Sequence, residues 1–415
     1  MLQDPILVGL ENDHHFLECI LRGAEGNRDL EVTAAEATPC CKSGDNYMSS
    51  ITRVLISGCD RSGKAFKRSV LMKRQPANVV RRLTFRCDPA FRNETCSYET
   101  IVPLMAEFAG CSMPFPECLH ASSQLIVLQD LKPLGFGMAD RLKGLDLDHS
   151  LLALKALAQF HGTSLAMKHS EPEKFQGIRS LTTELAFSQD SEPVFGASVE
   201  NGLKMALIAL EEKNSEKTVG SSWTFFEAVH KLNLLRGSVF RRLRAAVQPL
   251  EPLGVLCHGD LWLNNMLFRY ENNTPTEVKF VDLQVMRYSS LATDILYFLC
   301  TSVEPSVLSF YHDDLIVAYH QSLTETLEKL APGAPQIAIA QINDQIEDLA
   351  LFGLLMGFLL LPAITVESDL IDLDSMQHGE DLASKFEQQR EQMMSAKYRE
   401  RVRSLVLYFI ERNFI

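Results

Sequence analysis

Short runs of alternating apolar and polar residues characterise the first third of the chain. Residues 49–57 (SSITRVLIS) and 69–73 (SVLMK) have this alternation, which predicts two β-strands. Between them, residues 58–64 (GCDRSGK) are rich in types that tolerate the backbone of a tight turn, so an antiparallel hairpin is expected. A further short apolar run over 124–128 (QLIVL) predicts another strand.

Helical spacing of apolar residues dominates the remainder. The run 89–108 has this spacing, and Pro103 is expected to kink or divide it. After residue 130 the pattern lengthens, and 150–167 presents a continuous apolar helical face. The polar stretch 169–196 is interpreted as a variable excursion. Further helices are predicted over 198–250, 306–332 and, as one long amphipathic helix, 381–412.

The size of the chain indicates more than one structural unit. A length of 415 residues exceeds what one hydrophobic core usually organises, and 46% apolar with 22% charged residues is typical of globular proteins. Length thus indicates two or three domains or lobes, and the change from strand patterns to helical patterns near residue 130 favours an α+β fold of two lobes. A β-rich lobe would span 1–129 and a mainly helical lobe 130–415, with the boundary near 129–133.

Charge and cysteine spacing exclude several classes of function. A formal net charge of -13 provides no basic face for a nucleic-acid backbone, and an anionic nucleotide would need local neutralisation. The ten cysteines form no pair of CxxC units, which argues against a zinc site. The N-terminus has no charged-then-apolar leader, so we expect a reduced, cytoplasmic protein.

One apolar stretch reaches the lower length limit of a membrane span. Residues 349–366 (LALFGLLMGFLLLPAITV) contain no charge. However, Gly353, Gly357 and Pro362 interrupt the run, and acidic residues without any Lys or Arg flank it. We predict a buried core helix and no membrane insertion.

The strongest chemical signal is residues 255–268 (VLCHGDLWLNNMLF), where apolar strands flank a polar loop. Phosphoryl transfer needs a carboxylate that orients the attacking hydroxyl and accepts its proton, and Asp260 fits this role. Asn265, five positions later, fits a ligand of Mg²⁺. His258 is expected to brace the backbone of the loop by hydrogen bonding.

A second carboxylate ends another apolar strand in VKFVDLQ. Asp282 at this position can bridge Mg²⁺ to phosphate oxygens. Each of these residues alone has a simple structural explanation, such as a turn or a cap. The ordered combination of HGDxxxxN and an apolar-Asp-x-Gln pattern predicts an ATP- and Mg²⁺-dependent kinase.

The segments HGDLWLNN, FVDLQ and SSLATDILYF resemble the ecdysteroid-kinase-like family, which is related to choline and aminoglycoside kinases. The resemblance implies a bilobal, protein-kinase-like fold. It extends through residues 44–50 (GDNYMSS), VLMK ending at 73, 91–103 (FRNETCSYETIVP), 125–136 (LIVLQDLKPLGF) and 157–164 (LAQFHGTS).

This resemblance assigns roles to residues of the first lobe. Lys73 would bind the α- and β-phosphates of ATP, and Glu94 would form the ion pair that holds Lys73. Glu94 is preferred to Glu99 because FRNETCSY matches the family's F-x-x-E-x-x-x-Y spacing. The loop that covers the phosphates would contribute Gly44, Asp45, Asn46 and Ser49.

Residues 127–131 (VLQDL) would form the hinge, where backbone groups of Gln129 and Leu131 read the adenine edge. The chain departs from the family by having Gln129 in place of Glu, a change that backbone recognition should tolerate. It also has Leu283 where the family has Phe after the metal-binding Asp, which could alter the rigidity of that loop. In the second lobe, His161 is expected to be a hydrogen-bonded core residue, and Asp294 is expected to anchor the catalytic loop.

The leading hypothesis is therefore a kinase that phosphorylates a hydroxyl of an ecdysteroid, a xenobiotic or another lipophilic small molecule. A choline- or aminoglycoside-type kinase and a non-catalytic nucleotide-binding scaffold remain alternatives. A protein kinase is disfavoured because the chain has no DFG and no subsequent APE segment. The acceptor would be chosen by variable helices of the second lobe.

Overall fold

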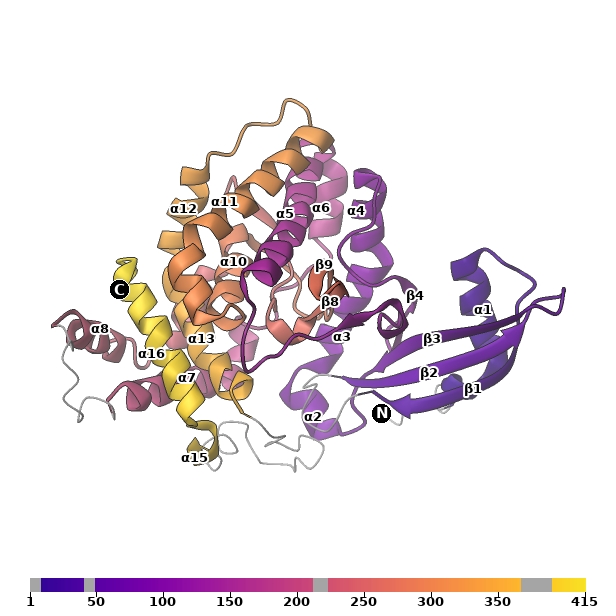
Figure 1. The fold of residues 1–415 in the computed structure, drawn as a ribbon, viewed down its shortest axis with the longest axis horizontal. Coiled ribbons are helices and arrows are strands. Elements are labelled where there is room, and N and C mark those ends of the chain that lie inside the picture. Colours follow the sequence, from indigo (N-terminus) through magenta and orange to yellow (C-terminus); the bar gives the residue numbers. More distant parts are fainter. Residues whose placement is uncertain (1–8, 41–48, 212–222, 367–389) are drawn as a thin grey trace.

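The computed structural model describes residues 9–40, 49–211, 223–366 and 390–415. The N-terminal part contains an antiparallel five-stranded sheet in the order β1-β2-β3-β5-β4, which lies beside a larger, mainly helical part (Figure 1). Its strands are β1 (Glu31–Pro39), β2 (Ser50–Cys59), β3 (Ala65–Arg74), β4 (Cys118–Ala121) and β5 (Leu125–Gln129). The expected α+β class is confirmed.

The predicted hairpin is formed by β2 and β3. In the turn, the Asp60 carboxylate accepts hydrogen bonds from the backbone amides of Ser62 at 2.9 Å and Lys64 at 3.0 Å. Gly63 has a φ of +81°, a conformation that favours glycine. One face of the sheet is covered by α1 (His14–Glu25), a helix that the residue pattern did not predict, and its apolar side chains share a core with the strands.

The predicted helix over 89–108 is divided. It consists of α3 (Cys87–Cys96), a π-helical turn over Ser97–Ile101 and α4 (Val102–Ala109), preceded by the short α2 (Val79–Thr84). Pro103 stands at the start of α4, where its missing N–H costs little. The buried side chains of α3 and α4 belong to the core of the helical part, so this segment joins the two parts.

The helical part is built around α5 and α11, which pack along each other. Its helices are α5 (Leu147–Ser170), α6 (Pro172–Arg179), α7 (Glu192–Glu211), α8 (Trp223–Asn233), α9 (Val239–Ala246), α10 (Leu291–Thr301), α11 (Pro305–Leu330), α12 (Ile339–Asp348), α13 (Ala350–Ile364), α15 (Arg390–Met393) and α16 (Ala396–Glu411). The stretch 169–196 is not merely a polar excursion, because it contains α6 and the start of α7.

The prediction of one long helix over 381–412 is wrong for the residues that the structure describes. Residues 381–389 lie outside the described residues, and the remainder forms α15 and α16. The Ser395 hydroxyl accepts a hydrogen bond from the Tyr398 amide at 3.1 Å and so begins α16 with an N-cap. A cap of this kind ends one helix and starts another without Pro or Gly.

Two small sheets inside the helical part position the polar loops. The strands β7 (Gly254–Cys257) and β10 (Arg287–Ser290) pair with each other, and β6 (Phe136–Gly137), β8 (Met266–Glu271) and β9 (Thr274–Phe280) form the second sheet. The loop 258–265 therefore connects β7 to β8, and the loop 281–286 connects β9 to β10. The first loop starts from a fully buried strand, and the second starts from a strand that is buried only at Val278 and Phe280.

The apolar stretch 349–366 corresponds to α13, which contacts α7, α10 and α16. Leu354 and Phe358 are fully buried, which confirms the prediction of a core helix. Among the described helices, none is by itself long and apolar enough to cross a membrane, and α12 and α13 pass that test only as a pair bent by 56°.

Candidate active site

Lys73 lies near the end of β3 between two carboxylates. Its Nζ is 2.9 Å from Glu94 Oε1 on α3 and 2.9 Å from Asp282 Oδ1 in the loop after β9. Because side chains alternate along a strand, buried Met72 faces the core with α1 while Lys73 points to the opposite face. Three elements from distant parts of the chain thus meet at one ammonium group.

Electrostatics keep this lysine charged although it is only 3% exposed. Burial alone would lower the pKa of the Lys73 ammonium, but Asp282 and Glu94 raise it above its ordinary value. Burial raises the pKa of Glu94, and the charge of Lys73 opposes that effect. Glu99, the alternative partner, is exposed.

Asp260 and Asn265 are joined within the loop 258–265. The Asn265 amide nitrogen donates to Asp260 Oδ2 at 2.8 Å and to the Asp260 carbonyl at 2.9 Å. The hydroxyl of Tyr297 on α10 donates to Asp260 Oδ1. Burial raises the pKa of Asp260 to about 7, although the hydrogen bond from Tyr297 opposes this shift.

Asp294 holds the backbone of the same loop from the first turn of α10. Its carboxylate accepts hydrogen bonds from the amides of His258 at 2.6 Å and Gly259 at 2.9 Å. Gly259 has a φ of +86°, and a Cβ there would lie 2.2 Å from the Val285 carbonyl oxygen. A side chain at position 259 would therefore clash with the loop that carries Asp282.

His258 links the two polar loops. Its Nε2 lies 3.0 Å from the Val281 carbonyl oxygen, one residue before Asp282. Burial lowers the pKa of His258, so a neutral imidazole that donates to this carbonyl accounts for the contact. The geometry is that of a brace between the loops.

Asp282 adopts a φ of 70°, a left-handed conformation that non-glycine residues rarely occupy. The Val281 amide donates to the Asn265 carbonyl at 3.0 Å, which fixes the two loops side by side. Leu283, the expected departure from the family pattern, is fully buried and belongs to the core. The smaller side chain is thus still a packing residue.

The donor set suits a magnesium ion. Asn265 uses its amide nitrogen on Asp260, which leaves its oxygen as the ligand atom, and Asp282 has a second carboxylate oxygen besides the one on Lys73. Carboxylate and amide oxygens are hard ligands of the kind that Mg²⁺ binds together with phosphate.

The predicted phosphate-covering loop is described only in part. Gly44, Asp45 and Asn46 lie outside the described residues. Ser49 is buried, and its carbonyl oxygen accepts a hydrogen bond from Arg81 Nη2 at 3.2 Å. Its contact with phosphate stays a prediction.

At the predicted hinge, the backbone narrows the choice of groups that could face adenine. The Gln129 amide already donates to the Glu117 carbonyl at 2.9 Å, and the Leu131 carbonyl accepts from Leu134 at 3.1 Å. Within the part of the chain that the structure describes, the carbonyl of Gln129 and the amide of Leu131 remain the candidates for contact with adenine. Asp130 between them accepts hydrogen bonds from Arg53 at 2.7 Å and Ser69 at 2.5 Å, which fixes the segment.

Three residues near the site were missed by sequence reasoning. Besides Tyr297, Asn93 donates from its amide nitrogen to the carbonyls of Gln284 at 3.1 Å and Met286 at 2.8 Å, which ties α3 to the loop after Asp282. Arg287 is buried and donates to the Gly259 carbonyl at 3.3 Å. Of these three residues, only Asn93 had a signal in the sequence, which was its position next to Glu94.

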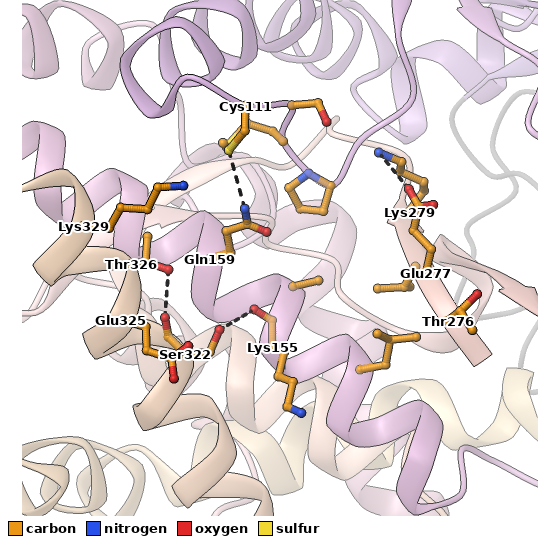
Figure 2. Close-up of a pocket in the computed structure, with 16 residues that line it drawn as sticks. Cys111, Lys155, Gln159, Thr276, Glu277, Lys279, Ser322, Glu325, Thr326 and Lys329 are labelled. Atoms are coloured by element: carbon orange, nitrogen blue, oxygen red, sulfur yellow. Dashed lines mark hydrogen bonds and ion pairs between the residues drawn. The ribbon is translucent and has the colours of Figure 1, made fainter. Parts of the chain in front are cut away.

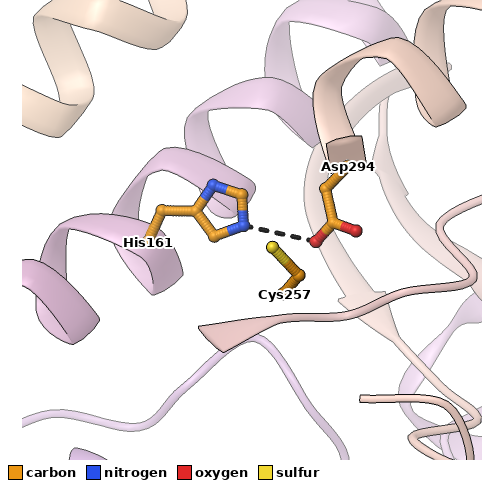
Figure 3. Close-up of side chains that lie close together, drawn as sticks. All are labelled: His161, Cys257 and Asp294. Carbon is orange, nitrogen blue, oxygen red and sulfur yellow. Dashed lines mark hydrogen bonds and ion pairs between the residues drawn. The ribbon is translucent and has the colours of Figure 1, made fainter. Parts of the chain in front are cut away.

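A buried cluster of His161, Cys257 and Asp294 has spacing that could suit a metal ion (Figure 3). However, His161 contacts the Tyr319 hydroxyl at 2.7 Å with Nδ1 and Asp294 at 3.2 Å with Nε2. Burial raises the pKa of Cys257 well above its ordinary value, which disfavours the thiolate that a metal requires. The expectation of a hydrogen-bonded core histidine is confirmed.

A cavity of about 590 Å³ opens between α5, α11, β9 and the loop after α4 (Figure 2). Lys155, Lys279 and Lys329 stand around it, together with acidic Glu277 and Glu325. Lys73, Asp260 and Asp282 are not among the described residues that line it. These three candidate site residues therefore do not face the cavity, although its wall includes Lys279 of β9, three positions before Asp282.

The strand-rich part and the helical part, which contains the two polar loops, form a protein-kinase-like fold. Residues 43–331 match the sequence model of the ecdysteroid kinase-like family, and the chain belongs to this family. The family resemblance drawn from the motifs is thereby confirmed. A search of curated protein sequences gave no match.

Solved structures of small-molecule kinases resemble the chain distantly. An ethanolamine kinase of Plasmodium vivax shows 13% identity and a TM-score of 0.38, with 92% of this chain and 83% of that chain covered. The GDP and kanamycin complex of APH(2")-IIia shows 11% identity and a TM-score of 0.39, with 82% of this chain and 89% of that chain covered. Amicoumacin kinase hAmiN in complex with AMP-PNP and Ca²⁺ shows 12% identity and a TM-score of 0.38, with 88% of this chain and 87% of that chain covered. Because these matches are distant, the assignment rests on the family match.

Proposed function

We propose that this chain transfers the γ-phosphate of ATP to a hydroxyl of a small, mostly apolar molecule such as an ecdysteroid or a xenobiotic. The observation that carries the proposal is the contact of Lys73 with Glu94 and Asp282, beside a loop in which Asp260 is joined to Asn265. A lysine for polyphosphate, oxygen ligands for Mg²⁺ and a carboxylate for the acceptor are the parts that phosphoryl transfer needs.

Each residue has a defined task in this reaction. Lys73 would bind the α- and β-phosphates, while Asn265 and Asp282 would hold Mg²⁺, which would supply charge neutralisation for phosphoryl transfer. Asp260 orients the acceptor hydroxyl and takes its proton as the oxygen forms a bond to phosphorus and the bond to ADP breaks. Its pKa of about 7 suits a general base that works near neutral pH.

Net charge and family membership both bear on the class of acceptor. A net charge of -13 permits attraction of a cation, so charge does not decide between an apolar acceptor and choline or an aminoglycoside. Family membership favours a lipophilic acceptor held mainly by shape. The presence of Lys73, Glu94 and Asp282 together with Asp260 argues against a non-catalytic scaffold. We also propose a cytoplasmic location, which is the expectation from the sequence.

A substrate panel tests the proposal. The purified chain is incubated with ATP and Mg²⁺ and with ecdysteroids, apolar glycosides, choline or aminoglycosides, and products are scored for a mass gain of one phosphate group. Asp260→Asn serves as the matched inactive control. Turnover of the cationic members alone would overturn the proposed acceptor class, and nucleotide binding without turnover of any hydroxyl would favour the scaffold.

A further inference from the structure

Tyr297 is a buried residue of α10 whose hydroxyl reaches the candidate catalytic base. The hydroxyl donates to Asp260 Oδ1, while Asn265 donates to Oδ2 at 2.8 Å. Each carboxylate oxygen is thus held by a side chain from a different segment. Because an ionised carboxylate oxygen can accept more than one hydrogen bond, Asp260 can still accept a hydrogen bond from an acceptor hydroxyl.

The helix that carries Tyr297 is itself rigidly placed. Every residue of α10 is buried. Asp294, three positions before Tyr297, lies on the same helical face and holds the backbone amides of His258 and Gly259. One face of α10 therefore fixes both the backbone of the catalytic loop and the side chain of Asp260.

The ring of Tyr297 is also fixed by packing. It lies against Phe352 of α13, with ring centroids 6.5 Å apart and an interplanar angle of 48°. A tyrosine has two side-chain torsions, so a packed ring leaves its hydroxyl little freedom. The position of the hydroxyl is consequently decided by the core of the helical part.

We propose that Tyr297 is a positioning residue that sets the orientation of the Asp260 carboxylate toward the acceptor hydroxyl. This inference rests on the proposed kinase function. The terminal torsion of an aspartate has broad energy wells, so the backbone alone does not fix the plane of the carboxylate. Donors at both oxygens do fix it, and a displacement of about 1 Å at a reacting group can cost on the order of 100-fold in rate.

The decisive variant is Tyr297→Phe, which removes one oxygen atom and keeps the ring that packs on Phe352. Tyr408→Phe is the matched control, because Tyr408 is also buried and its hydroxyl contacts His312 Nδ1 at 2.7 Å, within a different side-chain pair. We expect Tyr297→Phe to lower kcat at least tenfold and to leave the KM for ATP within about twofold, since Asp260 does not bind the nucleotide. Tyr408→Phe should change neither value.

Two measurements keep the outcome decisive. An unchanged kcat for Tyr297→Phe, or an equal loss in both variants, overturns the positioning role. Crystal structures of the wild type and both variants form the second measurement, in which we expect the Asp260 carboxylate to rotate in Tyr297→Phe alone. If the Asp260 carboxylate keeps its orientation in Tyr297→Phe, the inference is overturned, whether or not the wild type phosphorylates an acceptor. Failure of the wild type to phosphorylate any acceptor would count separately, against the proposed function.

Discussion

Glu94→Gln is the substitution that most directly tests the buried charge cluster. The change keeps the shape of the side chain and removes its charge, so Lys73 loses the carboxylate that lies 2.8 Å away at its nearest oxygen. Both side chains are almost completely buried, and solvent therefore screens the pair little. Glu99→Gln, at an exposed position five residues further along the same helical segment, is the matched control.

The expected magnitude follows from what remains around Lys73. Breaking a buried ion pair by neutralising one partner costs about 3–5 kcal/mol of folding free energy. Lys73 keeps Asp282 Oδ1 at 2.9 Å, so we expect the lower end of that range, about 3 kcal/mol. Without Glu94 as a charged partner, Lys73 and Asp282 would pair with each other, so the ammonium would be less available to phosphate and the carboxylate less available to Mg²⁺. The Kd for Mg-ATP should therefore rise at least tenfold, which corresponds to about 1.4 kcal/mol.

Thermal unfolding followed by circular dichroism measures the loss of stability, and isothermal titration calorimetry measures the Kd for Mg-ATP. Glu99→Gln should match the wild type in both experiments. If Glu94→Gln and Glu99→Gln behave alike in unfolding and in nucleotide binding, the reasoning about the Lys73 cluster is refuted.

Three further outcomes are expected. Asp260→Asn should abolish phosphate transfer and leave the affinity for Mg-ATP nearly unchanged, and near-normal turnover by the folded variant would remove the assignment of Asp260 as the base. Asp282→Ala should weaken Mg²⁺-dependent ATP binding because the metal loses a charged ligand, and an unchanged Kd in calorimetry would contradict this. The free energy of unfolding should fall as the pH drops from 6.5 toward 4, because burial lowers the pKa of His312 from 6.5 to about 4 and the unfolded chain therefore binds the proton first. His312→Gln should make stability less dependent on pH in this window, and an equal slope in the variant would exclude His312 as a cause.

The sequence by itself determined the local features of this protein. The β2–β3 hairpin and the strands that flank Asp260 follow from alternation and turn residues, which act over a few positions. Burial of α13 follows from its composition, because a helix apolar on all sides must be covered by other elements. The motifs around Asp260, Asn265, Asp282 and Asp294 carried the family resemblance, and the strand and helix patterns predicted the α+β class.

The tertiary structure alone decided which distant residues meet. Lys73 contacts Asp282 across 209 positions of sequence, and Tyr297 reaches Asp260 from another helix. No short pattern marks such contacts, because they depend on how buried strands and helices pack. The omission of α1 has a different reason, because its Asp13 N-cap and the helical spacing of Leu17, Ile20 and Leu21 are local signals that were overlooked. Local preference thus specified the elements and the reactive motifs, whereas burial and packing specified the charge cluster and the groups that orient the base.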